Sequence, residues 1–218
     1  MQQGIEAVFR HPVIPVLTVE DPAKSIELAR ALGAGGLDVL EVTLRTSVAF
    51  ECVEAIVHAL PGVTVGVGTV NRPEDFERAV RAGARFAVSP GATPALIEAA
   101  GDSPIPWLPG SATVSEALAL LEHGIRYQKL FPAAVLGGVR YLDAIAAPVA
   151  EAAFCPTGGL DAANAAEYLS RPNVVCVGGS WVAPHAAVAL GDWAAVTALA
   201  SSASALARGY VPGNRLDG

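Results

Sequence analysis

The sequence predicts an α/β protein in which strands and helices alternate along the chain. Short apolar runs rich in Val, Ile and Leu recur throughout, as expected of strands buried on both faces of a parallel sheet. Segments with apolar residues at helical spacing separate these runs, and several begin with a capping residue. The connections are short, so each strand forms a compact unit with the helix that follows it.

About eight such units fit into 218 residues, which favours a single domain with a (β/α)₈, or TIM, barrel near the short end of that fold's range. A doubly wound open sheet is the alternative, but no GxGxxG turn follows the first strand. We expect the barrel to span residues 1–208, with a short helix at 1–10. Residues 209–218 (GYVPGNRLDG) are expected to form a loose C-terminal tail.

The expected strands are eight short, mostly apolar runs. They cover residues 13–18, 37–46, 63–69, 85–90, 105–110, 125–131, 151–159 and 173–180. Helices are expected between them. Asp21–Pro22 and Thr93–Pro94 each place an N-cap side chain before a Pro in the first helical turn, Thr113 and Glu116 form a capping-box pattern, and Asp161 caps a later helix.

Composition and charge narrow the possible functions. The chain is 52% hydrophobic and 16% charged, which indicates a folded core. Its formal charge of −7 disfavours nucleic acid or an anionic membrane as the main partner, whereas a small anionic substrate needs only local donors. The N-terminus lacks a signal-peptide core, and charged and small polar residues interrupt residues 182–207, which we interpret as a terminal helix and not a membrane span.

The three cysteines, Cys52, Cys155 and Cys176, are odd in number and widely spaced. They suit neither a disulfide framework nor a zinc site, so we expect a reducing, cytoplasmic location. Cys155 and Cys176 lie on apolar strands and are interpreted as inert core thiols. The four histidines are scattered and interpreted as surface residues, and no cluster of metal ligands is evident in the sequence, so no metal and no cofactor is expected.

Lys129 lies on the expected strand of residues 125–131 and shares its parity with Tyr127 and Phe131. Burial of a lysine favours the neutral amine, which is a nucleophile toward carbonyls, so Lys129 is a Schiff-base candidate. The structural alternative is a lysine that reaches solvent or pairs with a carboxylate. That alternative is favoured on this stretch alone, because most lysines are exposed.

Glu41 and Arg45 lie on the expected strand of residues 37–46, on the parity that would face the barrel interior. Glu41 is a candidate general base, and the guanidinium of Arg45 can donate two parallel hydrogen bonds to a carboxylate. A structural ion pair between the two is an equal alternative. On the next strand, Thr69 supplies a hydroxyl on the parity of Val65 and Val67, which we expect to face the interior. On this strand alone, the favoured alternative is that its small residues only ease the barrel packing.

Two glycine pairs end the last two expected strands, in TGG (residues 157–159) and GGS (residues 178–180). The loops after these strands hold phosphate in many barrels, where backbone N–H groups bind the anion. The occurrence of the same feature in both loops favours a phosphate site over ordinary turn glycines.

Six segments in order resemble the 2-keto-3-deoxy-6-phosphogluconate (KDPG) aldolase family, which includes 4-hydroxy-2-oxoglutarate (KHG) aldolases. They are LEVTLRT (40–46), VGVGTV (65–70), FAVSPG (86–91), KLFPA (129–133), FCPTGG (154–159) and VGGSW (177–181). The resemblance implies a metal-independent class I aldolase that is typically a homotrimer. It would cleave KDPG to pyruvate and glyceraldehyde 3-phosphate, and relatives cleave KHG to pyruvate and glyoxylate.

The resemblance also implies roles for individual residues. Lys129 matches the Schiff-base lysine and Glu41 the acid/base carboxylate. The residues around the pyruvate moiety would be Arg45, Thr69, Pro90, Phe131 and Thr157, and those at the phosphate end Gly158, Gly159, Gly179 and Ser180.

Two positions depart from the family pattern KFFPAE, with Leu130 in place of an aromatic residue and Ala134 in place of the glutamate. Leu130 should pack outward with little effect, whereas Ala134 bears on the substrate and on loop closure. Two alternatives stay open. The first is an aldolase for the galactonate epimer of KDPG, although the CPTGG segment favours the gluconate form. The second is a phosphate-binding barrel without catalysis, and the presence of Lys129, Glu41 and Arg45 argues against it.

Overall fold

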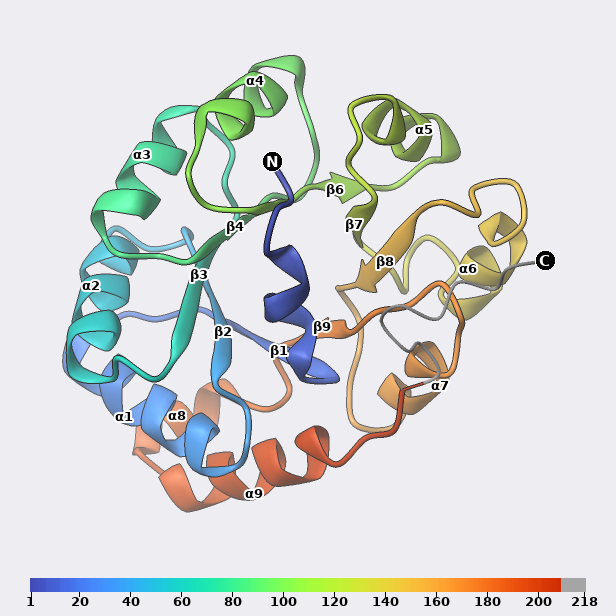
Figure 1. Ribbon diagram of the computed structural model, residues 1–218. Coiled ribbons are helices and arrows are strands. Elements are labelled where there is room, and N and C mark those ends of the chain that lie inside the picture. The colour runs from blue at the N-terminus through green and yellow to red at the C-terminus, as the bar shows by residue number, and fades with distance from the viewer. Residues whose placement is uncertain (209–218) are drawn as a thin grey trace.

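The structure of the protein is a computed structural model that describes residues 1–208, in which helices surround a curled parallel sheet (Figure 1). The strands are β1 (Val13–Leu17), β2 (Val39–Thr43), β3 (Thr64–Gly68), β4 (Phe86–Val88), β5 (Trp107–Leu108), β6 (Gly110–Ser111), β7 (Tyr127–Leu130), β8 (Ala153–Pro156) and β9 (Val177–Gly179). The helices are the 3₁₀ helix η1 (Ile5–Arg10), α1 (Pro22–Ala34), α2 (Ala49–Ala59), α3 (Glu74–Arg81), α4 (Pro94–Asp102), α5 (Val114–Glu122), α6 (Val139–Ile145), α7 (Ala165–Leu169), α8 (His185–Leu190) and α9 (Trp193–Ser204). The predicted tail, residues 209–218, lies outside the described part of the chain.

Every strand pairing in the described chain is parallel, which confirms the predicted α/β class. Six strands form one sheet in the order β5-β4-β3-β2-β1-β9, and three form another in the order β6-β7-β8. Isolated parallel bridges, Phe154 with Val174 and Thr157 with Gly178, connect the β8 segment with β9 and the residues just before it. The structure therefore shows a strongly curled sheet with helices outside it.

The expected fifth strand is divided in two, so residues 1–208 contain nine strands where eight were predicted. The break falls at Pro109, which has no backbone N–H to donate to a ladder. Residues before it pair with β4, and residues after it pair with β7. The Pro109 carbonyl still accepts a hydrogen bond from the backbone of Lys129, at 2.7 Å. The division thus redirects the segment from one neighbour to the other.

Several predicted helix starts are confirmed in atomic detail. The side chains of Asp21 and Thr93 accept hydrogen bonds from the first turns of α1 and α4, and Thr113 with Glu116 forms a complete capping box on α5. Asp161 instead caps the turn before α7, which begins at Ala165. The expected terminal helix is two helices, α8 and α9, and among the helices of residues 1–208 none has the length and apolar character needed to cross a membrane.

Two apolar clusters lie on opposite faces of the sheet. The larger one fills the layer between strands and helices, and it includes Leu130, which packs outward as predicted. The smaller one combines inward-facing strand residues with Ile5, Val8 and Phe9 of η1. Figure 1 shows the N-terminal segment in the middle of the molecule, with the curled sheet around it. The short leading helix is therefore part of the interior packing.

The prediction for β3 was wrong about which residues face inward. Val65 and Val67 belong to the outer cluster, where they pack toward the helices. Gly66 and Gly68 take the inward positions, because a Cβ at Gly66 would lie 2.4 Å from the Phe86 ring and one at Gly68 would lie 2.0 Å from Glu41 Oε1. The inner face of β3 has no side chains at these two positions, and the side chains of Phe86 and Glu41 occupy that space.

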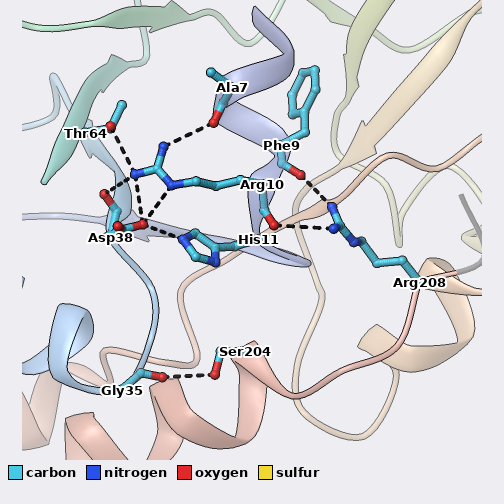
Figure 2. A network of polar contacts seen from close by, with 9 residues as sticks. All are labelled: Ala7, Phe9, Arg10, His11, Gly35, Asp38, Thr64, Ser204 and Arg208. Atoms are coloured by element: carbon cyan, nitrogen blue, oxygen red, sulfur yellow. Dashed lines mark hydrogen bonds and ion pairs between the residues drawn. The ribbon is translucent and has the colours of Figure 1, made fainter. Parts of the chain in front are cut away.

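Polar contacts hold the N-terminal segment against the strands. The Gln2 amide donates to the carbonyls of Trp107 and Tyr127, at 3.2 and 2.6 Å, and accepts from the Tyr127 N–H. Figure 2 shows Arg10 and His11 joined to Asp38, which precedes β2, and Arg208 donating to the carbonyls of Phe9 and Arg10. Residues from both ends of the described chain therefore fix η1 in place.

Candidate active site

Lys129 and Glu41 form a buried ion pair on the inner face of the curled sheet. Lys129 Nζ lies 3.2 Å from Glu41 Oε1, and the side chains are only 7% and 4% exposed. They come from β7 and β2, which are not neighbours in either sheet. The alternative of a solvent-reaching lysine is therefore wrong, and the carboxylate partner of Lys129 is Glu41. Burial of two charges is costly unless they meet at close range, so both groups must be held accurately.

The surroundings of this pair fix the Glu41 carboxylate. The inward face of Gly68 leaves the space that Glu41 fills, as the 2.0 Å approach of a hypothetical Cβ shows. The aromatic ring of Phe131 lies 5.5 Å from Lys129 Nζ, within range for a cation–π contact. The β7–β8 register places Lys129 beside Cys155. The Phe131 ring thus lies near the lysine end of the pair, and the absence of a side chain at Gly68 makes room for the carboxylate end.

A cavity of about 650 Å³ opens at the carboxyl ends of β1, β2, β8 and β9. Its walls include seven of the predicted site residues, namely Arg45, Phe131, Thr157, Gly158, Gly159, Gly179 and Ser180. Lys129 and Glu41 do not line it, but Phe131 does, and the centroid of its ring lies 5.5 Å from the lysine nitrogen. The cavity therefore begins directly beside the buried pair.

Arg45 was predicted to lie on the strand of residues 37–46, and this prediction is wrong. β2 ends at Thr43, whose hydroxyl donates to the Leu17 carbonyl at 2.8 Å, and Arg45 follows in an exposed turn. Its side chain reaches the cavity from the rim and not from the interior. The alternative of a structural ion pair between Arg45 and Glu41 is also wrong, because Glu41 pairs with Lys129.

Thr69 and Pro90 lie outside the cavity wall, near the pair. Thr69 follows Gly68 with a φ of 64°, a conformation that β-branched residues rarely adopt and that is common at functional sites. The Pro90 carbonyl oxygen would lie 2.1 Å from a Cβ at Gly110, and Gly110 is the register partner of Lys129. Both residues therefore belong to segments that pack against the neighbours of Lys129 and Glu41.

The two glycine pairs form the far wall of the cavity. Gly158 and Gly159 have φ values of 97° and 78°, which only glycine adopts readily, so their loop turns sharply after β8. A Cβ at Gly178 would lie 2.3 Å from the Thr157 hydroxyl, and one at Gly179 would lie 1.7 Å from the Trp181 ring. Backbone conformation therefore requires glycine in the first pair and close approach requires it in the second, and all four glycines line the cavity.

Some cavity residues were not identified from the sequence. Trp181 comes directly after the GGS segment, and this position in the sequence is the one signal that could have identified it as a cavity residue. Thr18, Glu20 and His185 also line the wall, and no pattern marked them. The interpretation of the histidines as surface residues holds for His185 but is wrong for His11, which is half-buried against Asp38.

All three cysteines are buried, as was predicted for Cys155 and Cys176, and none of them forms a disulfide. Burial raises the pKa of the Cys176 thiol well above its usual value, and contact with Cys155 raises it further. Burial likewise raises the pKa of Cys52. These thiols are therefore poor nucleophiles. Within residues 1–208, no group of three or more His, Cys, Asp or Glu side chains could hold a metal ion.

A sequence model of the aldolase family described as KDPG and KHG aldolase matches residues 5–199. The chain belongs to this family. The KHG/KDPG aldolase of Escherichia coli (strain K12) is 45% identical over 192 residues, which cover 88% of this chain and 90% of that protein.

Two solved structures of KDPG aldolases are also similar. The enzyme of Legionella pneumophila, with pyruvate captured at low pH as a covalent carbinolamine intermediate, has a TM-score of 0.89 at 46% identity and covers 91% of this chain and 97% of its own. The enzyme of Zymomonas mobilis ZM4 with 3-phosphoglycerate has a TM-score of 0.90 at 42% identity and covers 97% of this chain and 100% of its own.

Proposed function

We propose that this protein is a class I aldolase that cleaves KDPG to pyruvate and glyceraldehyde 3-phosphate. The observation that carries the proposal is the buried pair of Lys129 and Glu41, 3.2 Å apart beside a cavity with a glycine-rich wall. An amine for imine formation and a carboxylate for proton transfer are the two groups that this reaction needs. Membership of the KDPG and KHG aldolase family supports the same conclusion.

The chemistry starts at Lys129. Glu41 is close enough to accept a proton from the ammonium group, which leaves a neutral amine to attack the C2 ketone. Loss of water from the resulting carbinolamine gives an iminium, which acts as an electron sink. Glu41, directly or through a water, then removes the C4 hydroxyl proton, and the C3–C4 bond breaks. A proton returns to C3 of the enamine, and hydrolysis releases pyruvate and restores Lys129.

The remaining site residues are assigned to the two ends of the substrate. Arg45 and Thr157 would hold the C1 carboxylate, and Thr69, Pro90 and Phe131 would surround the pyruvate moiety. Gly158, Gly159, Gly179 and Ser180 would bind the phosphate through backbone N–H groups and one hydroxyl. The common wall of Arg45, Thr157, the glycines and Ser180 supports this assignment, since one bound molecule could reach all of them.

Cleavage of KHG to pyruvate and glyoxylate is a second candidate activity, since the E. coli relative is a KHG/KDPG aldolase. It would use the same lysine and carboxylate and would not involve the phosphate wall. Cleavage of the galactonate epimer is a third candidate activity. This substrate differs from KDPG only in the configuration at C4. A comparison of turnover for the two epimers distinguishes the first activity from the third. A strong preference for the galacto epimer would make that epimer, and not KDPG, the proposed substrate.

We infer further that residues 1–208 form a single (β/α)₈ barrel domain. The bridges between the β8 and β9 segments and the division of one strand at Pro109 support closure of the two sheets into one ring. A cytoplasmic homotrimer without a cofactor is our proposal for the working enzyme. The three unpaired cysteines are consistent with a reducing compartment, and light scattering coupled to size exclusion would measure the number of subunits.

The decisive experiment is borohydride reduction in the presence of pyruvate, followed by intact mass measurement and peptide mapping. A pyruvate adduct on Lys129 is expected, together with cleavage of KDPG in an assay of released pyruvate. A folded sample without an adduct would contradict the class I mechanism and would favour a phosphate-binding barrel without this chemistry.

A further inference from the structure

We propose that His185 binds the phosphate end of the substrate and sets the preference for phosphorylated over unphosphorylated keto acids. The proposal rests on the function proposed above and adds a residue to its phosphate wall. His185 is the first residue of α8 and lines the 650 Å³ cavity together with Gly179 and Ser180. It also lines a smaller adjoining cavity of about 250 Å³ between α1 and α8.

The charges around the cavity give His185 this role. Among the cavity-lining residues of the described chain, Arg45 and His185 are the ones whose side chains can be cationic, and Glu20 contributes a carboxylate. KDPG carries an anionic group at each end, and Arg45 is assigned to the carboxylate end. The glycine wall and Ser180 offer the phosphate hydrogen bonds but no positive charge. A hydrogen bond between a cationic donor and an anion is about twice as strong as one between neutral groups, and the positive charge would also offset the repulsion from Glu20.

The position of His185 is fixed by its neighbours. The segment from Ser180 to His185 turns back through a hydrogen bond from the Ala183 N–H to the Ser180 carbonyl, at 3.1 Å. The Lys24 ammonium donates to the Ala189 carbonyl, at 3.1 Å, and so ties α8 to α1. The other charged group near His185, Asp21, accepts hydrogen bonds from the first turn of α1. Lys24 and Asp21 are thus already engaged, and the exposed imidazole remains available to a ligand.

The test compares two substrates that differ only in the phosphate, KDPG and 2-keto-3-deoxygluconate. The measured quantity is the ratio of their kcat/KM values in the unaltered protein and in His185→Gln, His185→Lys and His123→Gln. His123 is a matched control, since it is an exposed histidine at the end of α5. We expect the ratio to fall about tenfold in His185→Gln, to stay at least at its original value in His185→Lys, and to be unchanged in His123→Gln.

The outcomes separate this proposal from the general one. A ratio in His185→Gln that matches the unaltered protein would overturn the role of His185, as would an equal loss for both substrates. A ratio that falls equally in His185→Lys would overturn the electrostatic reason and with it the proposal. Borohydride trapping of pyruvate on Lys129 is measured in every variant. Loss of trapping in the unaltered protein would instead refute the aldolase mechanism itself.

Discussion

Lys129 Nζ and Glu41 Oε1 lie 3.2 Å apart, although 88 positions of sequence separate the two residues. Their strands, β7 and β2, share no ladder, so the contact crosses the interior of the curled sheet. Each charge has the other as its buried partner, and removal of one would leave the other uncompensated, at a cost of about 3–5 kcal/mol. The chemistry and the stability of the interior are therefore coupled at this pair.

Lys129→Arg separates these two contributions. The guanidinium keeps a positive charge beside Glu41 but stays protonated, so it cannot form an imine. We expect KDPG cleavage to fall by at least about 1000-fold and the borohydride adduct to disappear. Far-UV circular dichroism should show an unchanged fold. Lys129→Met is the comparison, because it removes the charge as well and should also lower the free energy of unfolding. Substantial turnover in Lys129→Arg would exclude Lys129 as the nucleophile.

Gly68→Ala tests how closely the Glu41 carboxylate is positioned. The new methyl group would lie 2.0 Å from Glu41 Oε1, so the flexible end of that side chain must move away from Lys129. We expect kcat to fall about 100-fold, the lower range for loss of general acid–base catalysis, while the fold is kept.

Gly62→Ala is the matched control for this change. Gly62 is exposed, and a Cβ at that position meets no atom within 4 Å. Its kcat should stay within about twofold of the unaltered protein, as expected of a surface substitution. Equal kcat values for Gly68→Ala and Gly62→Ala would show that the geometry of Glu41 does not limit the reaction.

Ser180→Ala tests the phosphate wall. Ser180 is exposed at the cavity surface, and loss of one hydrogen bond to a charged group costs about 1–3 kcal/mol. The kcat/KM for KDPG should therefore fall by about 5- to 150-fold. Cleavage of KHG, which carries no phosphate, provides the internal comparison. An equal fall for both substrates would argue against a contact between Ser180 and phosphate.

Much of the fold could be predicted from local patterns. The capping signals at Asp21, Thr93 and Thr113 depend only on nearby residues, and each was confirmed. The inward face of β3 could not be predicted in this way. Alternating Val and Gly fit either orientation, and the choice depends on Glu41 and Phe86, which come from other strands.

The candidate site shows the same division between local and long-range information. Lys129 and Glu41 stood out because a charge within an apolar strand needs an explanation. Arg45 was misplaced because strand parity carries no signal for where β2 ends, which is at Thr43. His185 was not identified because its role depends on the fold of α8 against β9 and α1, and nothing in its neighbouring residues indicates this.

Asp38→Asn tests the polar network that fixes the N-terminal segment (Figure 2). Partial burial raises the pKa of Asp38, but the hydrogen bond from His11 and the charge of Arg10 outweigh that effect, so the pKa is lowered overall. A carboxylate with a lower pKa in the folded state stabilises the fold above its unfolded pKa of about 3.9, and the contribution is lost as the pH falls through the folded value.

The variant should therefore be less stable than the unaltered protein at pH 7, by about 0.5–1 kcal/mol, because Asp38 is partly exposed and solvent screens the pair. The difference should shrink as the pH falls below about 4. Urea unfolding at pH 3 and pH 7 measures this difference, with Glu27→Gln as a control that breaks an exposed contact to Arg30, at 3.7 Å. A difference that is the same at both pH values would mean that the ionised carboxylate of Asp38 does not hold η1 in place.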